Sequence, residues 1–193
     1  MFQIRVHGRG GQGVVTAAEL LSVAAFLEGR HAQAFPSFGS ERTGAPVAAF
    51  CRIDDVPIRL REPVFEPDAL IIQDPTLLRQ HSVLDGLSPT GFVLVNSART
   101  WAQLGLTDVV DRLPPSHAVL VPASALALTH IGRAVPNAAL LGGFAALCGL
   151  MSLGSVVAAI EARFPSAVAA GNVCAARAAF EHVLAEIREV AHA

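Results

Sequence analysis

The sequence predicts an α/β fold: a Rossmann-like open sheet of mainly parallel strands with a helical C-terminal third. A short apolar run at Phe2–Val6 leads directly into a cluster of glycines and then into a helical pattern, which is the opening of a βαβ unit. Further apolar runs of strand length recur up to Val121, and from Ala123 onward the pattern favours helix. No repeat or linker interrupts the 193 residues, so we expect one domain over residues 1–193.

The elements follow in order along the chain. The first helix is expected over Val14–Glu28, closed by Gly29. After the first strand, we expect strands at His31–Phe35, Ala45–Ile53, Pro57–Leu60, Ala69–Gln73, Phe92–Asn96 and His117–Val121. The helices of the last third are expected at Ala123–Ile131, Asn137–Met151, Leu153–Phe164 and Asn172–His192.

The composition narrows the classes of partner. Hydrophobic residues make up 52% of the chain and charged residues only 16%, which excludes intrinsic disorder. A formal net charge of −2 excludes a strong global attraction to nucleic acid or to an anionic membrane. Because so few charges must cover the surface, we expect part of that surface to contact another protein.

The segment 134–160 carries no charged residue and could be read as a membrane span. Pro136, Gly142, Gly143 and Gly149 interrupt it, whereas a span needs about 20 continuous apolar residues. Buried helices, or a helix face against a partner subunit, are therefore favoured over a transmembrane helix.

The cysteines and the N-terminus indicate a reducing compartment. Cys51, Cys148 and Cys174 are far apart in sequence, so the chain alone cannot supply the four clustered ligands of a structural zinc site or an iron–sulfur cluster. The first residues read as a strand and not as a signal peptide. We therefore expect a cytoplasmic protein with no metal site of its own.

The glycine turn, Gly8–Gly13, has the G-x-G-x-x-G spacing of dinucleotide-binding turns. Glycines let backbone amides approach a phosphate, and the following helix presents its positive end to the anion. Binding of NAD would require an acidic residue about 20 positions further on, where this chain has Gln33 and Ala34. The Walker pattern is absent because the chain contains no lysine, so a phosphate must be bound by arginine or by the backbone. A turn without a ligand is the alternative.

A second polar segment, Pro36–Gly44, follows the predicted second strand. Prolines and glycines fix its backbone around hydroxyls and opposite charges, which a simple connector does not need. If the strands are parallel, this loop and the glycine turn both lie at carboxyl ends of strands, where open α/β sheets bind ligands. An ordinary surface loop is the alternative.

Two motifs together carry a family resemblance: His7–Gly13, and Pro36–Val47 with the sequence PSFGSERTGAPV. They closely resemble the gamma subunit of 2-oxoacid:ferredoxin oxidoreductases, the pyruvate/ketoisovalerate oxidoreductase gamma family. Asp74–Leu78 and Pro136–Phe144 fit later segments of that family, so the resemblance covers nearly the whole chain.

The resemblance implies a subunit that is not active alone. Such complexes convert a 2-oxoacid and coenzyme A into acyl-CoA, carbon dioxide and reduced ferredoxin or another acceptor. Thiamine diphosphate and [4Fe-4S] clusters are implied in partner subunits of the alpha, beta and delta types, and this chain is implied to contribute coenzyme A contacts and assembly surface.

The resemblance also assigns residues. The candidates for binding coenzyme A are Gly8, Arg9, Gly10, Gly11, Gln12, Gly13, Ser37, Ser40, Arg42 and Asn96. Asn96 resembles an asparagine near the thiol arm, with a strand-end cap as the alternative. We expect no catalytic residue in this chain, and we expect His7 to tune the turn without shuttling protons. An independent NAD(P)-binding reductase and a non-catalytic scaffold are the competing functions.

Overall fold

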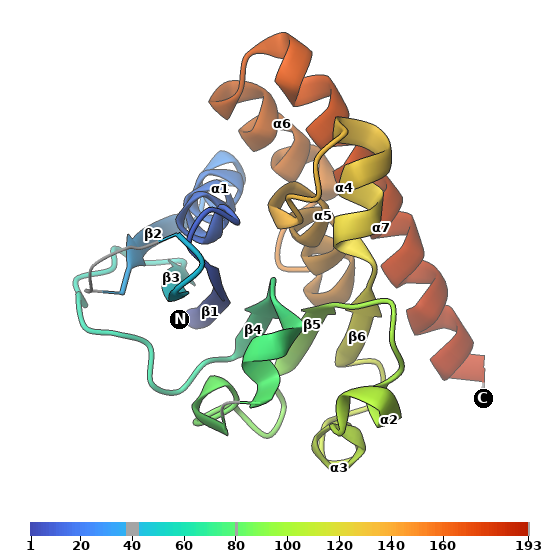
Figure 1. The fold of residues 1–193 in the computed structure, drawn as a ribbon. Helices are drawn as coiled ribbons and strands as arrows, with labels where there is room; N and C mark the ends of the chain where they lie inside the picture. Colours follow the sequence, from blue (N-terminus) through green and yellow to red (C-terminus); the bar gives the residue numbers. More distant parts are fainter. Residues whose placement is uncertain (38–42, 80, 193) are drawn as a thin grey trace.

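The computed structural model describes residues 1–37, 43–79 and 81–192, and these residues form a six-stranded sheet with helices on both faces (Figure 1). The strands are β1 (Phe2–Arg9), β2 (His31–Pro36), β3 (Pro46–Asp54), β4 (Ala69–Ile72), β5 (Phe92–Asn96) and β6 (Ala118–Val121). One face carries α1 (Val14–Leu27), α4 (Ala123–Ile131), α5 (Asn137–Cys148), α6 (Leu153–Arg163) and α7 (Ser166–His192). The other carries η1 (Pro75–Arg79), η2 (His81–Val83), α2 (Trp101–Leu104) and α3 (Thr107–Val110).

The sheet is mixed but mainly parallel, as predicted. The strand order is β2-β3-β1-β4-β5-β6, with β1, β4, β5 and β6 parallel and β3 antiparallel to both of its neighbours. Strand β2 therefore runs in the same direction as β1, although β3 lies between them. The chain leaves β1 toward one side of the sheet and returns to β4 on the other side. The point between β1 and β4 is thus a topological switch point, where open α/β sheets bind ligands.

The predicted strand at Pro57–Leu60 is wrong. This segment has no regular structure and belongs to a long connection from β3 to β4. Buried arginines on the sheet satisfy carbonyls of this connection: Arg5 donates to Val64 O at 3.3 Å, and Arg52 to Pro63 O at 3.4 Å. These side chains hold the last part of the connection against the sheet.

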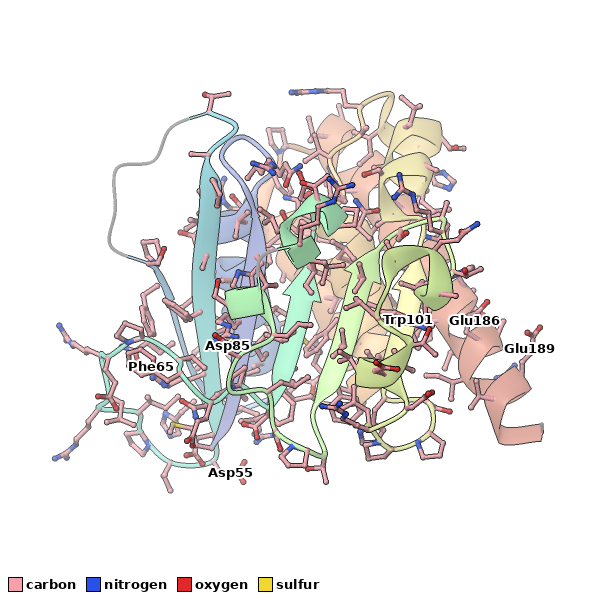
Figure 2. All side chains as sticks on the ribbon, turned by 60° about the horizontal axis from the view of Figure 1, so that its bottom comes forward. Asp55, Phe65, Asp85, Trp101, Glu186 and Glu189 are labelled. Carbon is pink, nitrogen blue, oxygen red and sulfur yellow. The ribbon has the colours of Figure 1, made fainter. Side chains whose placement is uncertain are left out.

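The same face of the sheet is crossed by a second segment that Arg5 contacts. Its Nη2 atom donates to the carbonyl oxygens of Val83 at 3.0 Å and Asp85 at 2.7 Å. Phe65 and Asp85, labelled in Figure 2, mark the two crossing segments, and Trp101 marks the start of α2 beyond them. One buried arginine therefore fastens two loops to the face of the sheet at β1.

The central part of the uncharged segment 134–160 is buried. The segment forms α5 and most of α6, and α5 is almost wholly buried between the sheet and α7. Among the described residues, no helix combines the length and the apolar character needed to cross a membrane. The absence of charge here reflects burial on all sides of α5.

Helix α7 begins at Ser166, earlier than the predicted Asn172, so that Gly171 lies inside the helix. A side chain at Gly171 would come within 2.7 Å of the carbonyl oxygen of His130, at the end of α4. Glycine at this position is therefore a packing requirement between two helices.

A carboxylate at the end of α1 caps α6. Glu28 accepts hydrogen bonds from Ser155 Oγ and, at 2.7 Å, from the N–H of Ser152. The hydrogen bond from Ser155 lowers the pKa of Glu28 from its ordinary value of 4.5, and the N–H of Ser152 acts in the same direction. The charged form of Glu28 thus joins two helices that are distant in sequence.

Glu28→Gln is expected to lower the free energy of unfolding at pH 7 by about 0.5 kcal/mol, a small effect because the carboxylate is exposed. Because the folded pKa is depressed, this stabilisation is present above pH 4.5 and is lost as the pH falls through the folded pKa. Denaturant unfolding of both forms at pH 7 and pH 3 measures it. A difference that grows at pH 3 would contradict the assignment.

Candidate functional site

The glycine turn joins β1 to α1 at the switch point of the sheet. Strand β1 continues three residues beyond the predicted end, because Gly8 and Arg9 pair with Val47 and Pro46 of β3. Gly11 has φ +93° and Gly13 has φ +74°, which is left-handed backbone that favours glycine. Gly13 is also the N-cap of α1 and brings no capping side chain.

The turn leaves backbone donors unused. The N–H of Gly10 donates to Ala45 O at 2.9 Å, and that of Gln12 donates to Arg9 O at 3.0 Å. In the described ranges no partner is found for the N–H groups of residues Gly11, Gly13, Val14 and Val15. These residues line a cavity of about 330 Å³, together with Arg9, Gly10, Thr16 and Val47. Unpaired amides at a helix N-terminus make this cavity a candidate anion site.

The end of the polar loop lies against the glycine turn, as expected from two carboxyl ends of strands. Gly10 and Thr43 form an isolated parallel bridge, and the N–H of Gly44 donates to Gly10 O at 3.0 Å. Ser37 extends the hairpin, since its N–H donates to Ala48 O at 2.9 Å. The candidates Ser40 and Arg42 lie outside the described residues.

Arg9 and Gln12 use their side chains within the protein. Arg9 Nε donates to Asp74 Oδ2 at 2.9 Å in an ion pair, Nη1 to Gly44 O at 3.0 Å, and Nη2 to Thr76 Oγ1 at 2.8 Å. Gln12 Oε1 accepts from the N–H of Arg9 at 2.8 Å, and its Nε2 donates to Asp74 Oδ2 at 3.2 Å. Both side chains therefore hold the turn to the residues that follow β4, and Arg9 also holds it to the polar loop.

Asp74 is the centre of this network, and residue patterns alone had not singled it out as a site residue. Its Oδ1 accepts from the N–H of Thr76 at 2.9 Å and from Thr76 Oγ1 at 2.6 Å. Burial alone would raise the pKa of Asp74, but hydrogen bonds from Thr76 and Gln12 and the charge of Arg9 together lower it. The available signal was its position, directly after a buried strand and before Pro75.

Asn96 lies at the neighbouring strand end and is 8% exposed. Its Nδ2 donates to Gln73 O and to Ser124 Oγ, both at 2.8 Å, and its Oδ1 accepts from the N–H of Ser124 at 3.0 Å. This geometry is that of a cap, which fastens the ends of β4 and β5 to the start of α4.

The start of α5 packs against the glycine turn. A Cβ atom at Gly13 would lie 2.5 Å from Nδ2 of Asn137, and one at Gly8 would lie 2.6 Å from Cγ2 of Val14. Asn137 is 6% exposed, and its Oδ1 accepts from the N–H of Ala138 at 2.8 Å. Glycine is therefore required at Gly8 for close packing, and at Gly13 for close packing and for its left-handed backbone.

Three other titratable side chains, those of His7, Cys51 and Cys148, have strongly shifted pKa values and are uncharged at pH 7. Burial, with a smaller contribution from the charge of Arg5, lowers the pKa of His7 to about 4, so its imidazole is neutral at pH 7. Burial raises the pKa values of Cys51 and Cys148 to about 12. The described part of the chain contains no group of three His, Cys, Asp or Glu side chains that could hold a metal ion.

Comparison with known proteins identifies similar chains. The family model described as pyruvate ferredoxin/flavodoxin oxidoreductase matches residues 3–182. The pyruvate/ketoisovalerate oxidoreductases common subunit gamma of Thermococcus litoralis is 45% identical over 94% of this chain and 96% of its own length. The crystal structure of pyruvate oxidoreductase subunit PORC from Thermotoga maritima has 35% identity and a TM-score of 0.77, covering 93% of this chain and 95% of that one.

A second similar structure shares the fold alone. The 2-oxoglutarate:ferredoxin oxidoreductase of Magnetococcus marinus, whose structure holds 2-oxoglutarate, coenzyme A and succinyl-CoA, is 16% identical with a TM-score of 0.72. The match covers 97% of this chain and 31% of that longer chain.

Proposed function

We propose a ligand for the glycine turn from the premise that this chain belongs to the pyruvate ferredoxin/flavodoxin oxidoreductase family and is the gamma subunit of a 2-oxoacid:ferredoxin oxidoreductase complex. In this proposal the turn binds the phosphate groups of coenzyme A. The observation that carries the proposal is the set of N–H groups at Gly11, Gly13, Val14 and Val15, which border one cavity and have no partner among residues 1–37, 43–79 and 81–192. Such donors favour an anion without needing a free cation.

The reaction of the complex needs groups that we place on other chains. Oxidative decarboxylation of a 2-oxoacid yields an acyl group, carbon dioxide and two electrons, and coenzyme A accepts the acyl group. Thiamine diphosphate and iron–sulfur clusters supply the decarboxylation and the electron transfer when bound, and we assign them to alpha-, beta- and delta-type partners in the cytoplasm. The part of this chain that the structure describes offers backbone donors at the glycine turn, and its role is binding and assembly.

Residues at the turn have different roles in this proposal. The N–H groups of Gly11 and of the first turn of α1 bind the pyrophosphate. Gly8 and Gly13 allow the close packing that orients these N–H groups. Ser37, Ser40 and Arg42 are proposed as secondary contacts, because the described end of their segment, at Thr43 and Gly44, lies against the turn. Asn96 is proposed to position the start of α4, because its amide atoms are bonded to the protein. The Magnetococcus marinus structure supports only the point that this fold occurs in an enzyme that binds coenzyme A.

Thr16→Glu tests the proposal. Thr16 lines the cavity in the first turn of α1, where a carboxylate stabilises the helix by about 0.3–1 kcal/mol. The same charge repels a bound phosphate. In the assembled complex we expect the apparent KM for coenzyme A to rise about tenfold, with stability kept or improved.

Thr16→Gln is the matched control, since it adds similar bulk without charge, and its KM should stay within about twofold of the wild type. Equal KM values for the Glu and Gln variants would contradict the proposal and favour a non-catalytic scaffold. Titration of the purified chain with NADH tests the independent reductase, which a micromolar dissociation constant would favour.

A further inference from the structure

The shape of the glycine turn depends on a side chain from another strand. Asp74 follows β4 and lies across the switch point from the turn, which follows β1. One carboxylate oxygen accepts from both Arg9 and Gln12 of the turn, and the other accepts twice from Thr76. Four hydrogen bonds thus converge on a single carboxylate that is mostly shielded from solvent.

The network also occupies the guanidinium of Arg9. Its Nε, Nη1 and Nη2 atoms each have an acceptor within the chain, on Asp74, Gly44 and Thr76. The charge of Arg9 is compensated by Asp74, and the plane of the guanidinium is held by three bonds in different directions. Arg9 in this position links the turn to the polar loop and to the residues that follow β4.

Gln12 completes the connection between the carboxylate and the backbone of the turn. Its amide nitrogen donates to Asp74, while its amide oxygen accepts from the N–H of Arg9. The position of that oxygen is therefore fixed by Asp74, and so is the path of the backbone from Arg9 to Gln12. Loss of Asp74 would release both side chains that hold this path.

We propose that Asp74 is a positioning residue for the anion site, which it shapes through Arg9 and Gln12 without touching the ligand. The inference rests on the proposed function, because the ligand is taken to be coenzyme A bound by the amides of the turn. It also assigns Arg9 to the turn and not to the phosphate. Three of the five N–H donors of Arg9 are already satisfied within the protein, and its charge is compensated by Asp74.

A double-mutant cycle in the assembled complex tests this role. Asp74→Ala and Arg9→Ala are each expected to raise the apparent KM for coenzyme A about tenfold, with kcat at saturating coenzyme A within about twofold of the wild type. Because both residues act through one network, the double variant should be no worse than the stronger single variant. Asp74→Asn keeps an acceptor for Thr76, so its apparent KM for coenzyme A should lie between those of Asp74→Ala and the wild type.

The controls separate positioning from folding. Asp111→Ala removes an exposed carboxylate at the end of α3 and should leave KM unchanged. Thr76→Val is a milder variant that removes one donor to Asp74 and one acceptor of Arg9, so it should raise KM about threefold even if Asp74→Ala fails to assemble.

Two outcomes would overturn the inference. If Asp74→Ala lowers KM or leaves it unchanged while Arg9→Ala raises it in both backgrounds, Arg9 is a phosphate ligand and Asp74 only restrains it. If Thr16→Glu raises KM and neither Asp74→Ala nor Thr76→Val does, the positioning role fails while the proposed function stands. No effect from any of these variants would overturn both.

Discussion

Gly142→Ala is expected to lower the free energy of unfolding by about 3 kcal/mol, although alanine is the better helix former. Gly142 lies in α5 against the backbone of α7, and a Cβ atom there would overlap the carbonyl group of Ala176. Backbone atoms cannot move aside as a flexible side chain can. The two helices would have to separate, and the buried contacts on both sides of α5 would be lost.

Guanidinium unfolding of the purified chain, wild type and variant, measures this change. Gly154→Ala in α6 is the matched control, since the nearest atom to its Cβ is Ser152 Oγ at 3.6 Å and the position is exposed. The control should raise stability by about 0.5 kcal/mol through helix propensity alone. Equal effects of the two variants would mean that α5 and α7 are not in close contact.

Gly13→Ala is expected to cost about 3 kcal/mol and to weaken coenzyme A binding in the complex. About 1–2 kcal/mol comes from placing a Cβ on left-handed backbone at φ +74°. The rest comes from its contact with Asn137, whose Nδ2 would be 2.5 Å away. Moving Asn137 shifts the start of α5 and the N-cap of α1 together. The N–H groups of the turn then no longer point toward one bound anion.

Gly11→Ala separates the two causes. Gly11 also has positive φ, at +93°, but a Cβ there would meet nothing within 4 Å. Its cost should therefore be backbone strain alone, about 1–2 kcal/mol. Denaturant midpoints of both variants give the difference, and the apparent KM for coenzyme A in the complex gives the functional part. A Gly11→Ala variant as unstable as Gly13→Ala would contradict the packing role of Asn137.

Elements bounded by local signals could be predicted closely. Strand β5 and helix α4 match their expected bounds at both ends. Helix α4 ends at Gly132 with φ +72°, a C-cap that the sequence itself carries, and β5 is a compact apolar run. Where the outcome depended on distant partners, prediction failed: β1 runs on to Arg9 because β3 pairs with it, and the segment 57–60 is not a strand because no described strand pairs with it.

The candidate site divides in the same way. The glycine turn, the start of α1 and the family motifs could be recognised from the chain itself, because backbone conformation and helix ends are set by neighbours in sequence. The pairing of Arg9 with Asp74 joins residues 65 positions apart, and that of Gly13 with Asn137 crosses most of the chain. Periodicity and spacing contain no information on such pairs. Only the strand order, with β4 beside β1, brings them together, and it makes Arg9 the ion-pair partner of the Asp74 carboxylate.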